Sequence, residues 1–433
     1  MGGRFVLHGF KSPGDSWFGL EPATCTQQDS RGGSGSPLKV AVVGAGVSGL
    51  VCALGLKRKH HVTIFDADDR AGGHANTRVV KENDRSIGID TGFIVFNFKN
   101  YPHLSGLFDR LGVSSQPSDM SFSVRCEKSG FEFSGSNLNT FFAQRRNLFR
   151  LEAWQLLRSI FAFHRDGNDA LRTDISDEIT VGEFAKHRGY RQNLIEHYLL
   201  PLGGALWSCS SESFSQFPVR FFLEFLRNHS MLQMEDRPVW RTVSGGSQHY
   251  VKKIVSQLES ELQLGHRVSR VTRAGTGVDL EFHNGKREHF DEVVLATHAD
   301  TSLNIIQAPD SEESELLSAF PYQDNVVTLH TDTRVLPKAQ RAWASWNYRV
   351  REDASAGTGV TYNMNKLQAL DAKHTYCVSL NQHDEIDQDC ILRREVVRHP
   401  LFTPGRDEFQ KRHQHVIRRG AISFCGAYWG FGF

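Results

Sequence analysis

The chain has 433 residues, which is more than a single hydrophobic core usually holds, so we expect two or three domains. Its 50 basic and 49 acidic residues give a formal net charge of +1, and no long run of one sign favours a nucleic-acid partner. A hydrophobic content of 39% and 30 phenylalanines exclude a chain that is disordered over most of its length.

Cysteine and histidine spacing predicts neither a metal site nor a disulfide framework. The seven cysteines are far apart and form no CxxC pair, which is typical of reduced thiols inside the cell. The 20 histidines are scattered, whereas zinc sites need clustered ligands. Lys11, Asp15 and Glu21 interrupt the first residues, so we predict no secretory signal and expect a cytoplasmic protein.

Residues 1–36 show little periodicity and are predicted to be a flexible tail that ends before Pro37. The uncharged stretch 40–56 could pass for a membrane anchor. Its 17 residues are marginal for a span, and four of them are glycines. We therefore interpret this stretch as part of a soluble domain.

A strand, a glycine turn, a helix and a second strand are predicted in succession after residue 37. LKVAVV (38–43) and HVTIF (61–65) have strand character, and residues 50–57 have helical spacing. The turn GAGVSG fits GxGxxG in its proper context, where a pyrophosphate binds at the helix N-terminus. The predicted cofactor-binding residues here are Gly44, Gly46, Val47, Ser48 and Gly49.

Asp66 ends the second predicted strand, 22 residues after Gly44. A carboxylate at about this separation meets the ribose hydroxyls of a bound dinucleotide. A glycine-rich turn followed by a solvated aspartate is the structural alternative. NAD and FAD share this fingerprint, so the choice between them depends on the residues that follow.

A second glycine pair follows Asp66 in the segment RAGGHANT (70–77). An acid followed by RxGGxxxT resembles the second signature of the flavin-containing amine oxidase superfamily. The resemblance implies FAD as cofactor and argues against an NAD-dependent dehydrogenase. It places Arg70, Gly72 and Gly73 along the pyrophosphate and ribityl chain, with Ala67 in the same site. His74 stands where an arginine is more common.

Further segments resemble one subgroup of this superfamily, the predicted NAD/FAD-binding amine-oxidase-like proteins. These are related to the N-terminal part of plant cyclopropane-fatty-acid synthase fusions. The matching segments include IDTGF (89–93), PLGGALWS (201–208), WRTVSGGSQHYV (240–251), LATHAD (295–300) and CGAYWGFGF (425–433). The likeness covers most of the chain from residue 38 onward.

The resemblance also implies roles for residues outside the two glycine motifs. Asp90, Thr91, Gly92 and Asn97 are expected near the cofactor edge. The strand with Val268 and Val271 would meet the adenine, while Ala296 and Thr297 would close the FAD domain. A last set of residues is expected either near the isoalloxazine or the substrate channel, or packed in the core. This set is Gly203, Gly204, Trp207, Trp240, Gly245, Gly246 and Tyr428.

The predicted fold class is α/β, a Rossmann-type FAD-binding domain of the GR2 kind with an interleaved α+β substrate domain. The FAD-binding parts are residues 37–115, 241–320 and 416–433. The substrate parts are residues 116–240 and 321–415, and the second of these is expected to hold a second sheet. The first is expected to be helical because its apolar residues recur every three or four positions, as in Leu151, Trp154, Leu157, Phe161 and in Phe214, Phe217, Phe221, Phe225.

The predicted function is that of an FAD-dependent oxidoreductase that oxidises a C–N or C–C bond of a small or lipid substrate. One alternative is an amine oxidase proper, in which Tyr428 or Phe433 would supply one side of an aromatic pair. Another is a non-catalytic or truncated FAD-binding protein, because the family's C-terminal segment continues beyond the point where this sequence ends. No nucleophile elbow, HExxH or P-loop is present. Catalytic residues, membrane association and oligomeric state stay unassigned.

Overall fold

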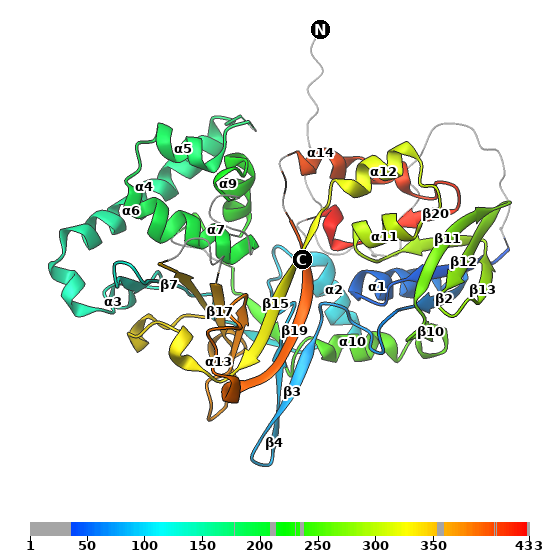
Figure 1. The fold of residues 1–433 in the computed structure, drawn as a ribbon, viewed down its shortest axis with the longest axis horizontal. Helices are drawn as coiled ribbons and strands as arrows, with labels where there is room; N and C mark the ends of the chain where they lie inside the picture. Colours follow the sequence, from blue (N-terminus) through cyan, green and yellow to red (C-terminus); the bar gives the residue numbers. More distant parts are fainter. Residues whose placement is uncertain are drawn as a thin grey trace, which may run out of the picture.

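The computed structural model describes residues 36–176, 178–207, 214–229, 231–233, 238–352, 359–401, 403 and 405–430. Nearly all of the tail predicted at 1–36 lies outside these residues. Two lobes stand side by side, one built on a parallel sheet and one on a second sheet with a group of helices (Figure 1). None of the described helices combines the length and the apolar composition that a membrane-spanning segment needs.

The first lobe contains a five-stranded sheet in the order β10, β2, β1, β14, β20. Its strands are β10 (Leu262–Gln263), β2 (His61–Phe65), β1 (Lys39–Val43), β14 (Glu292–Leu295) and β20 (Ile422–Phe424), and every pairing among them is parallel. The stretch considered as a membrane anchor is therefore β1 followed by α1 (Val47–Leu56).

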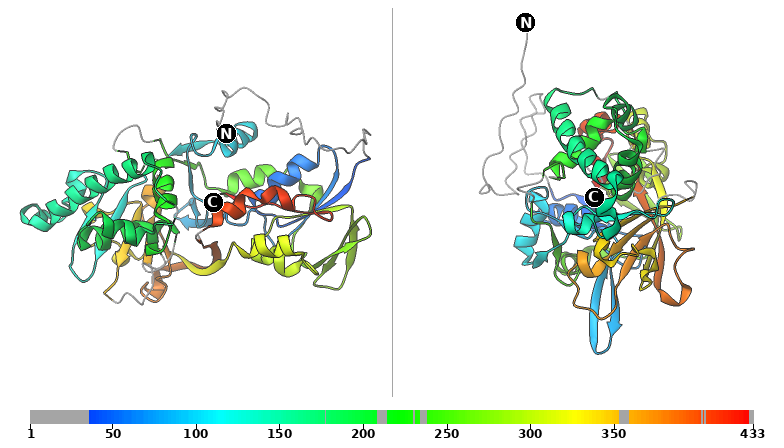
Figure 2. Two further views of the ribbon diagram at one scale, coloured as in Figure 1. Left: turned by 90° about the horizontal axis from the view of Figure 1, so that it is seen from above. Right: turned by 90° about the vertical axis from the view of Figure 1, so that its left-hand side faces the viewer.

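Both faces of this sheet are covered, which explains the nearly uninterrupted apolar sequence of β1. One face packs against α1 and α10 (Gln248–Val255). The other packs against the antiparallel strands β11 (Val268–Ala274), β12 (Gly277–Phe282) and β13 (Arg287–Phe290), together with α11 (Ala299–Ile305) and α12 (Ser311–Ser318). Figure 2 shows these layers from above.

The second lobe contains a seven-stranded sheet in the order β19, β15, β18, β17, β16, β7, β8. Its strands are β19 (Ile391–Pro400), β15 (Tyr322–His330), β18 (Cys377–Leu380), β17 (Gly359–Asn363), β16 (Trp346–Val350), β7 (Phe122–Cys126) and β8 (Glu132–Ser134). Only the pairing of β7 with β16 is parallel within this described sheet.

The expectation of a helical region over 116–240 was wrong for its first part. β7 and β8 belong to the large sheet, and β6 (Ser115–Pro117) joins β5 (Val95–Phe96) and β9 (Arg241–Val243) in a small one. The partner of β7 is β16, which lies more than two hundred residues further along the chain. Local periodicity carries no signal for such a pairing.

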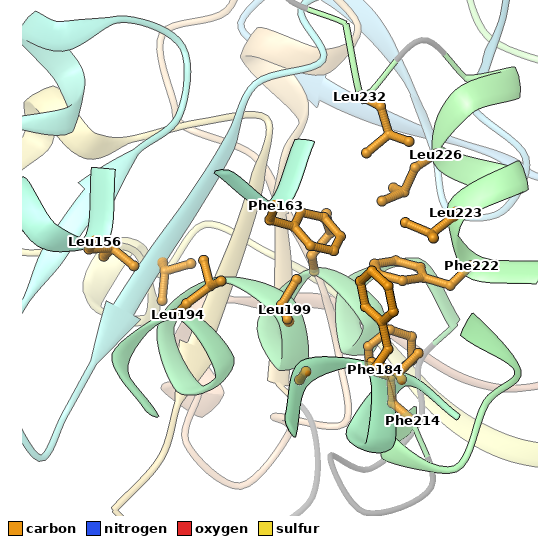
Figure 3. Packing of buried hydrophobic residues seen from close by; sticks show 14 of the residues in the cluster. Leu156, Phe163, Phe184, Leu194, Leu199, Phe214, Phe222, Leu223, Leu226 and Leu232 are labelled. Carbon is orange, nitrogen blue, oxygen red and sulfur yellow. The ribbon is translucent and has the colours of Figure 1, made fainter. Parts of the chain in front are cut away.

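Helices do occupy the rest of that region: α3 (Leu138–Phe141), α4 (Leu151–Arg172), α5 (Val181–His187), α6 (Gln192–Leu194), a π-helix (Ile195–Leu199), α7 (Leu200–Trp207) and α9 (Val219–Asn228). Phe163, Phe184, Phe214 and Phe222 meet in their core (Figure 3). The predicted stripe on α4 was misplaced, because Leu151, Trp154 and Phe161 are exposed.

Three further helices are α2 (Pro102–Leu111), α13 (Met364–Leu367) and α14 (Arg406–Lys411), and β3 (Thr77–Glu82) and β4 (Arg85–Asp90) form a hairpin. The other described elements are short 3-10 turns at Arg145–Phe149, Glu259–Glu261, Thr333–Val335, Gln340–Ala342, Gln388–Cys390, His413–Val416 and Ala427–Trp429. The predicted α/β class with interleaved lobes is confirmed.

Candidate functional site

The glycine turn between β1 and α1 is fixed by contacts inside the protein. The Gly44 amide donates to the Phe65 carbonyl oxygen over 2.7 Å, and Gly44 has a φ of +110°, which favours glycine. A Cβ on Gly44 would lie 2.8 Å from the Ala296 carbonyl oxygen, and one on Gly49 would overlap the Gly44 carbonyl. The fold itself therefore requires glycine at positions 44 and 49.

Gly46 differs from these two glycines, because no protein atom lies within 4 Å of the position its Cβ would take. Its φ of −66° and ψ of 171° suit any residue. Gly46 is the N-cap of α1, supplies no side-chain cap, and is followed by no acidic residue in the first turn. The open space at this helix end suits an anion, which the N–H groups and the helix dipole attract.

The second glycine pair forms the other wall of this space. The Gly72 amide donates to the Ala45 carbonyl over 2.8 Å, and Gly46 and Gly72 form an isolated parallel bridge. A Cβ on Gly73 would come within 3.2 Å of the Gly46 Cα. The Arg70 guanidinium donates to the Gly73 carbonyl over 2.8 Å and stabilises this turn. We call the space between the two turns the glycine cradle.

Asp66 joins the end of β2 to the glycine cradle. Its carboxylate accepts hydrogen bonds from the amides of Ala45 at 2.5 Å and Asp68 at 2.9 Å. Burial raises the pKa of this carboxyl, and the two amide bonds oppose that rise. Beside it, Ala67 lines a cavity of about 390 Å³ together with His266, Arg267, Phe282 and neighbouring residues.

His74 lies at one end of the cradle in a group with His298 and His399, which we call the histidine trio. The rings of His298 and His399 each lie 5.6 Å from the ring of His74. Burial and the neighbouring charges lower the pKa of all three, for His298 and His399 to about 4. The residue His74 as a whole is solvent-exposed, while its Nε2 lies 3.1 Å from the Arg398 carbonyl oxygen.

Asp90 is fully buried, and its carboxylate is taken up by protein groups. It accepts from the Ser247 amide and hydroxyl, the Thr77 hydroxyl at 2.5 Å and the Gln368 amide at 3.1 Å. Burial raises its pKa to about 6, while these donors favour the ionised form. The side chain faces the Gly245–Gly246 turn, so it positions that turn rather than pointing outward.

The neighbouring predicted residues pack behind the cradle. The Thr91 hydroxyl accepts from the Asn76 side chain over 2.9 Å, and a Cβ on Gly92 would overlap the His74 carbonyl. Asn97 is fully buried with its side-chain nitrogen unpaired. These contacts bring the segment 90–97 against the second glycine turn from behind.

The residues predicted on later strands also lie beside this lobe's sheet. Ala296 donates to the Val43 carbonyl over 2.7 Å and packs under Gly49, and the Thr297 hydroxyl bonds to Ser302 at 2.8 Å. The Val271 side chain is buried, and its carbonyl accepts from Gln307. Val268 follows Arg267, which lines the 390 Å³ cavity.

Tyr428 does not form one side of an open aromatic pair, because it is 2% exposed. Its ring packs 5.2 Å from that of Phe320 in the core of the first lobe. Burial raises the pKa of its phenol well above 10, and the ring of Trp429 lies 5.1 Å from its own ring. Phe433, the other candidate, lies outside the described residues.

Most of the remaining candidates pack into the structure rather than line an open space. A Cβ on Gly203 would overlap the Phe214 ring, and one on Gly246 would lie 2.5 Å from a Thr77 methyl. Gly245 has a φ of +80°, which suits the turn it forms. Trp240 stacks on His229 at 5.8 Å. Gly204 is buried in α7, and the Trp207 side chain lies outside the described part.

Sequence reasoning missed an aromatic pair on the second sheet, Trp346 and Tyr362. The two residues are direct partners across β16 and β17, and their rings meet edge to face at 4.9 Å. Both are half-buried, the Trp346 indole N–H is buried without a partner among the described residues, and burial raises the pKa of Tyr362. The helix α7 packs against both strands. No local sequence pattern indicates that these two residues lie opposite each other, because their pairing depends on the register of β16 and β17.

The parallel sheet, the two abutting glycine turns and the acid at the end of β2 define a dinucleotide-binding oxidoreductase fold. Residues 47–399 match the pattern of the flavin containing amine oxidoreductases. The chain belongs to this family of FAD-dependent oxidoreductases.

An L-amino-acid oxidase from Siganus canaliculatus is 24% identical over 336 residues, which make up 67% of this chain and 56% of that protein. The chain thus spans little more than half the length of this relative.

Solved structures share the fold at low sequence identity. The fatty acid isomerase from P. acnes that produces CLA has a TM-score of 0.66 at 15% identity, covering 92% of this chain and 96% of that one. Cyclohexylamine oxidase from Brevibacterium oxydans has a TM-score of 0.65 at 15% identity, covering 92% and 95%. Putrescine oxidase bound to putrescine has 0.62 at 14%, covering 92% and 94%.

Proposed function

We propose that the chain holds FAD in the glycine cradle and oxidises a C–N or C–C bond of a small or lipid substrate. The observation that carries this proposal is Gly46, a glycine that no packing contact within the described residues requires. It stands at an uncapped helix N-terminus that faces a second glycine turn. Close approach of a pyrophosphate explains glycine at this position.

The residues around the cradle fit the other parts of FAD. Free lone pairs on the Asp66 carboxylate suit the ribose hydroxyls, and the cavity beside Ala67 and Arg267 is close enough to take the adenine. The proposed contact set is Gly44, Gly46, Val47, Ser48, Gly49, Asp66, Ala67, Arg70, Gly72, Gly73 and His74, with Val268, Ala296 and Thr297 behind it. Asp90 and Tyr428 support this set from the core.

The bound FAD supplies a hydride acceptor. The chain's own residues position the donor carbon and exclude water. At neutral pH the histidine trio is uncharged, because the pKa of each member is lowered. His74 therefore offers a hydrogen-bonding ring and no positive charge to the cofactor, unlike the arginine more common there.

The aromatic pair Trp346 and Tyr362 is the proposed substrate contact. An aromatic edge-to-face pair gives an apolar surface against which the hydrocarbon part of a substrate would pack. Lipid substrates are included because the motifs resemble the subgroup related to plant cyclopropane-fatty-acid synthase fusions. The two lobes are proposed to be the interleaved FAD-binding and substrate domains. A cytoplasmic location is proposed as well, and the free thiols of Cys52, Cys126, Cys377, Cys390 and Cys425 support it.

An amine oxidase proper is the second candidate, supported by the L-amino-acid oxidase relative. The two candidates differ in which compound reduces the flavin. The FAD-loaded protein is mixed without oxygen with monoamines, polyamines, L-amino acids or vesicles of unsaturated phospholipid, and the loss of flavin absorbance is followed. Reduction by phospholipid alone supports the lipid assignment, and reduction by amines alone supports the second candidate.

A variant at the aromatic pair tests the substrate site with either class of compound. Trp346→Leu removes the aromatic ring from this pair, so we expect the rate of flavin reduction to fall about tenfold with FAD content unchanged. Trp343→Leu is the matched control, because Trp343 is also half-buried in this lobe but lies outside the pair. Equal rates in the two variants would contradict this placement.

A further inference from the structure

The tip of the helical lobe, where α3 leads into α4, presents apolar side chains to solvent. Phe149 is 91% exposed and Leu151 is 72% exposed. Leu138, Leu148 and Trp154 are also exposed large apolar residues of this corner. The corner lies at the end of the molecule that is farthest from the parallel sheet (Figure 1). We call residues 138–158 the α3–α4 tip.

Hydrogen bonds and packing hold these side chains outward. The Trp154 indole N–H donates to the Leu148 carbonyl over 2.9 Å, and its ring lies 4.7 Å from that of the buried Phe142. The Arg145 guanidinium donates to the Phe142 carbonyl over 3.0 Å. The 3-10 turn 145–149 is therefore anchored at both ends, and the protrusion of Phe149 is part of the fold.

Four arginines surround the apolar residues and carry uncompensated charge. Arg145, Arg146, Arg150 and Arg158 are all exposed, and none of them forms an ion pair with a described residue. Glu152 is the one acidic residue within the tip's sequence. Apolar side chains that protrude among arginines match an anionic lipid surface, into which the apolar groups insert while the arginines meet the headgroups.

We infer that the α3–α4 tip docks the protein peripherally on a membrane surface that contains anionic phospholipid. The half-exposed Trp154 suits the interface, where tryptophan is enriched. A second copy of this chain fits less well, because a two-fold interface through the tip would bring two sets of arginines together. The inference extends the proposed function and does not depend on flavin binding.

Vesicle co-sedimentation of the full chain tests the inference directly. The vesicles contain phosphatidylcholine alone or with 30% phosphatidylserine. We expect binding to the anionic vesicles that weakens as salt rises. Replacing Phe149 and Leu151 by serine is expected to weaken binding at least about tenfold. Neutralising two arginines, Arg146→Gln with Arg150→Gln, is expected to cost about 25-fold, or about fivefold for each charge.

The matched control carries Val79→Ser and Val396→Ser. These residues are 67% and 65% exposed but lie on β3 and β19, away from the tip. The control is expected to bind as the unaltered chain does, and unchanged thermal unfolding of each variant verifies folding. Absence of binding to anionic vesicles would overturn the inference, as would equal binding by the tip and control variants. Light scattering that shows a dimer lost only in the tip variant would assign the surface to a second copy instead.

Discussion

Replacing Gly46 by alanine separates the role of this glycine from the roles of its neighbours. The added methyl group meets no protein atom within 4 Å, and the backbone at φ −66° and ψ 171° already suits alanine. Because alanine is a poorer N-cap than glycine, we expect the free energy of unfolding to fall by no more than about 1 kcal/mol. The methyl group nevertheless enters the space assigned to the pyrophosphate.

The expected loss of FAD affinity follows from the contacts that the methyl group would block. Hydrogen bonds from backbone amides to a charged group contribute about 1.5–3 kcal/mol each. Displacing the pyrophosphate from two amides at the start of α1 would cost about 3–6 kcal/mol, which corresponds to a dissociation constant raised about 10²- to 10⁴-fold. Quenching of flavin fluorescence during titration of the flavin-free protein measures this constant.

Two further glycine variants make the result interpretable. Gly49→Ala would overlap the Gly44 carbonyl, so we expect it to lower the free energy of unfolding by about 3 kcal/mol or more. Gly106→Ala, inside α2, meets no protein atom outside its own helix; it should leave FAD affinity unchanged and raise the free energy of unfolding by up to about 1 kcal/mol, because alanine favours a helix interior. If Gly46→Ala bound FAD as tightly as Gly106→Ala, the pyrophosphate would not lie in the glycine cradle.

Three other expectations concern stability, measured by urea unfolding of the flavin-free protein. The pKa of His298 is lowered to about 4, so the unfolded chain takes up the proton first. The contribution of His298 to the free energy of unfolding is therefore complete above pH 6.5 and falls by on the order of 3 kcal/mol as pH is lowered to about 4. If the stability difference between the unaltered chain and His298→Gln did not depend on pH, this reasoning would be contradicted. Tyr428→Phe removes a buried hydroxyl that makes only a weak contact with the Trp429 side chain among the described residues, so we expect the free energy of unfolding to change by less than about 1 kcal/mol, and a larger loss would contradict this. Asp90→Asn puts a donor among the donors of Ser247 and Gln368 and should cost about 2–4 kcal/mol at pH 7.5; a loss below 1 kcal/mol would show that the network tolerates an amide.

The first glycine motif could be predicted because its determinants are local in the sequence. The strand, the turn that holds Gly44 to Gly49 and the helix follow one another directly along the chain. Spacing alone could not predict that the second glycine turn packs against the first, because the bridge between Gly46 and Gly72 joins two separate loops. The resemblance to the amine oxidase superfamily supplied that connection.

Packing between distant segments explains the errors. Helical spacing identified α4 but not its buried side, which is set by partners such as Phe222 and Leu223 on α9. Sequence spacing likewise does not indicate that the buried Asp90 carboxylate accepts a hydrogen bond from the Ser247 amide over 2.9 Å. The mixed polar and apolar sequence of Phe122–Cys126 does not indicate that this segment forms a strand paired with β16.

The visible absorption spectrum of the purified chain after addition of FAD and removal of free flavin tests the central claim most directly. The account predicts flavin bands near one FAD per chain in the unaltered protein and their loss in the Gly46→Ala variant, which should remain folded. A folded, unaltered protein without flavin bands would contradict the account.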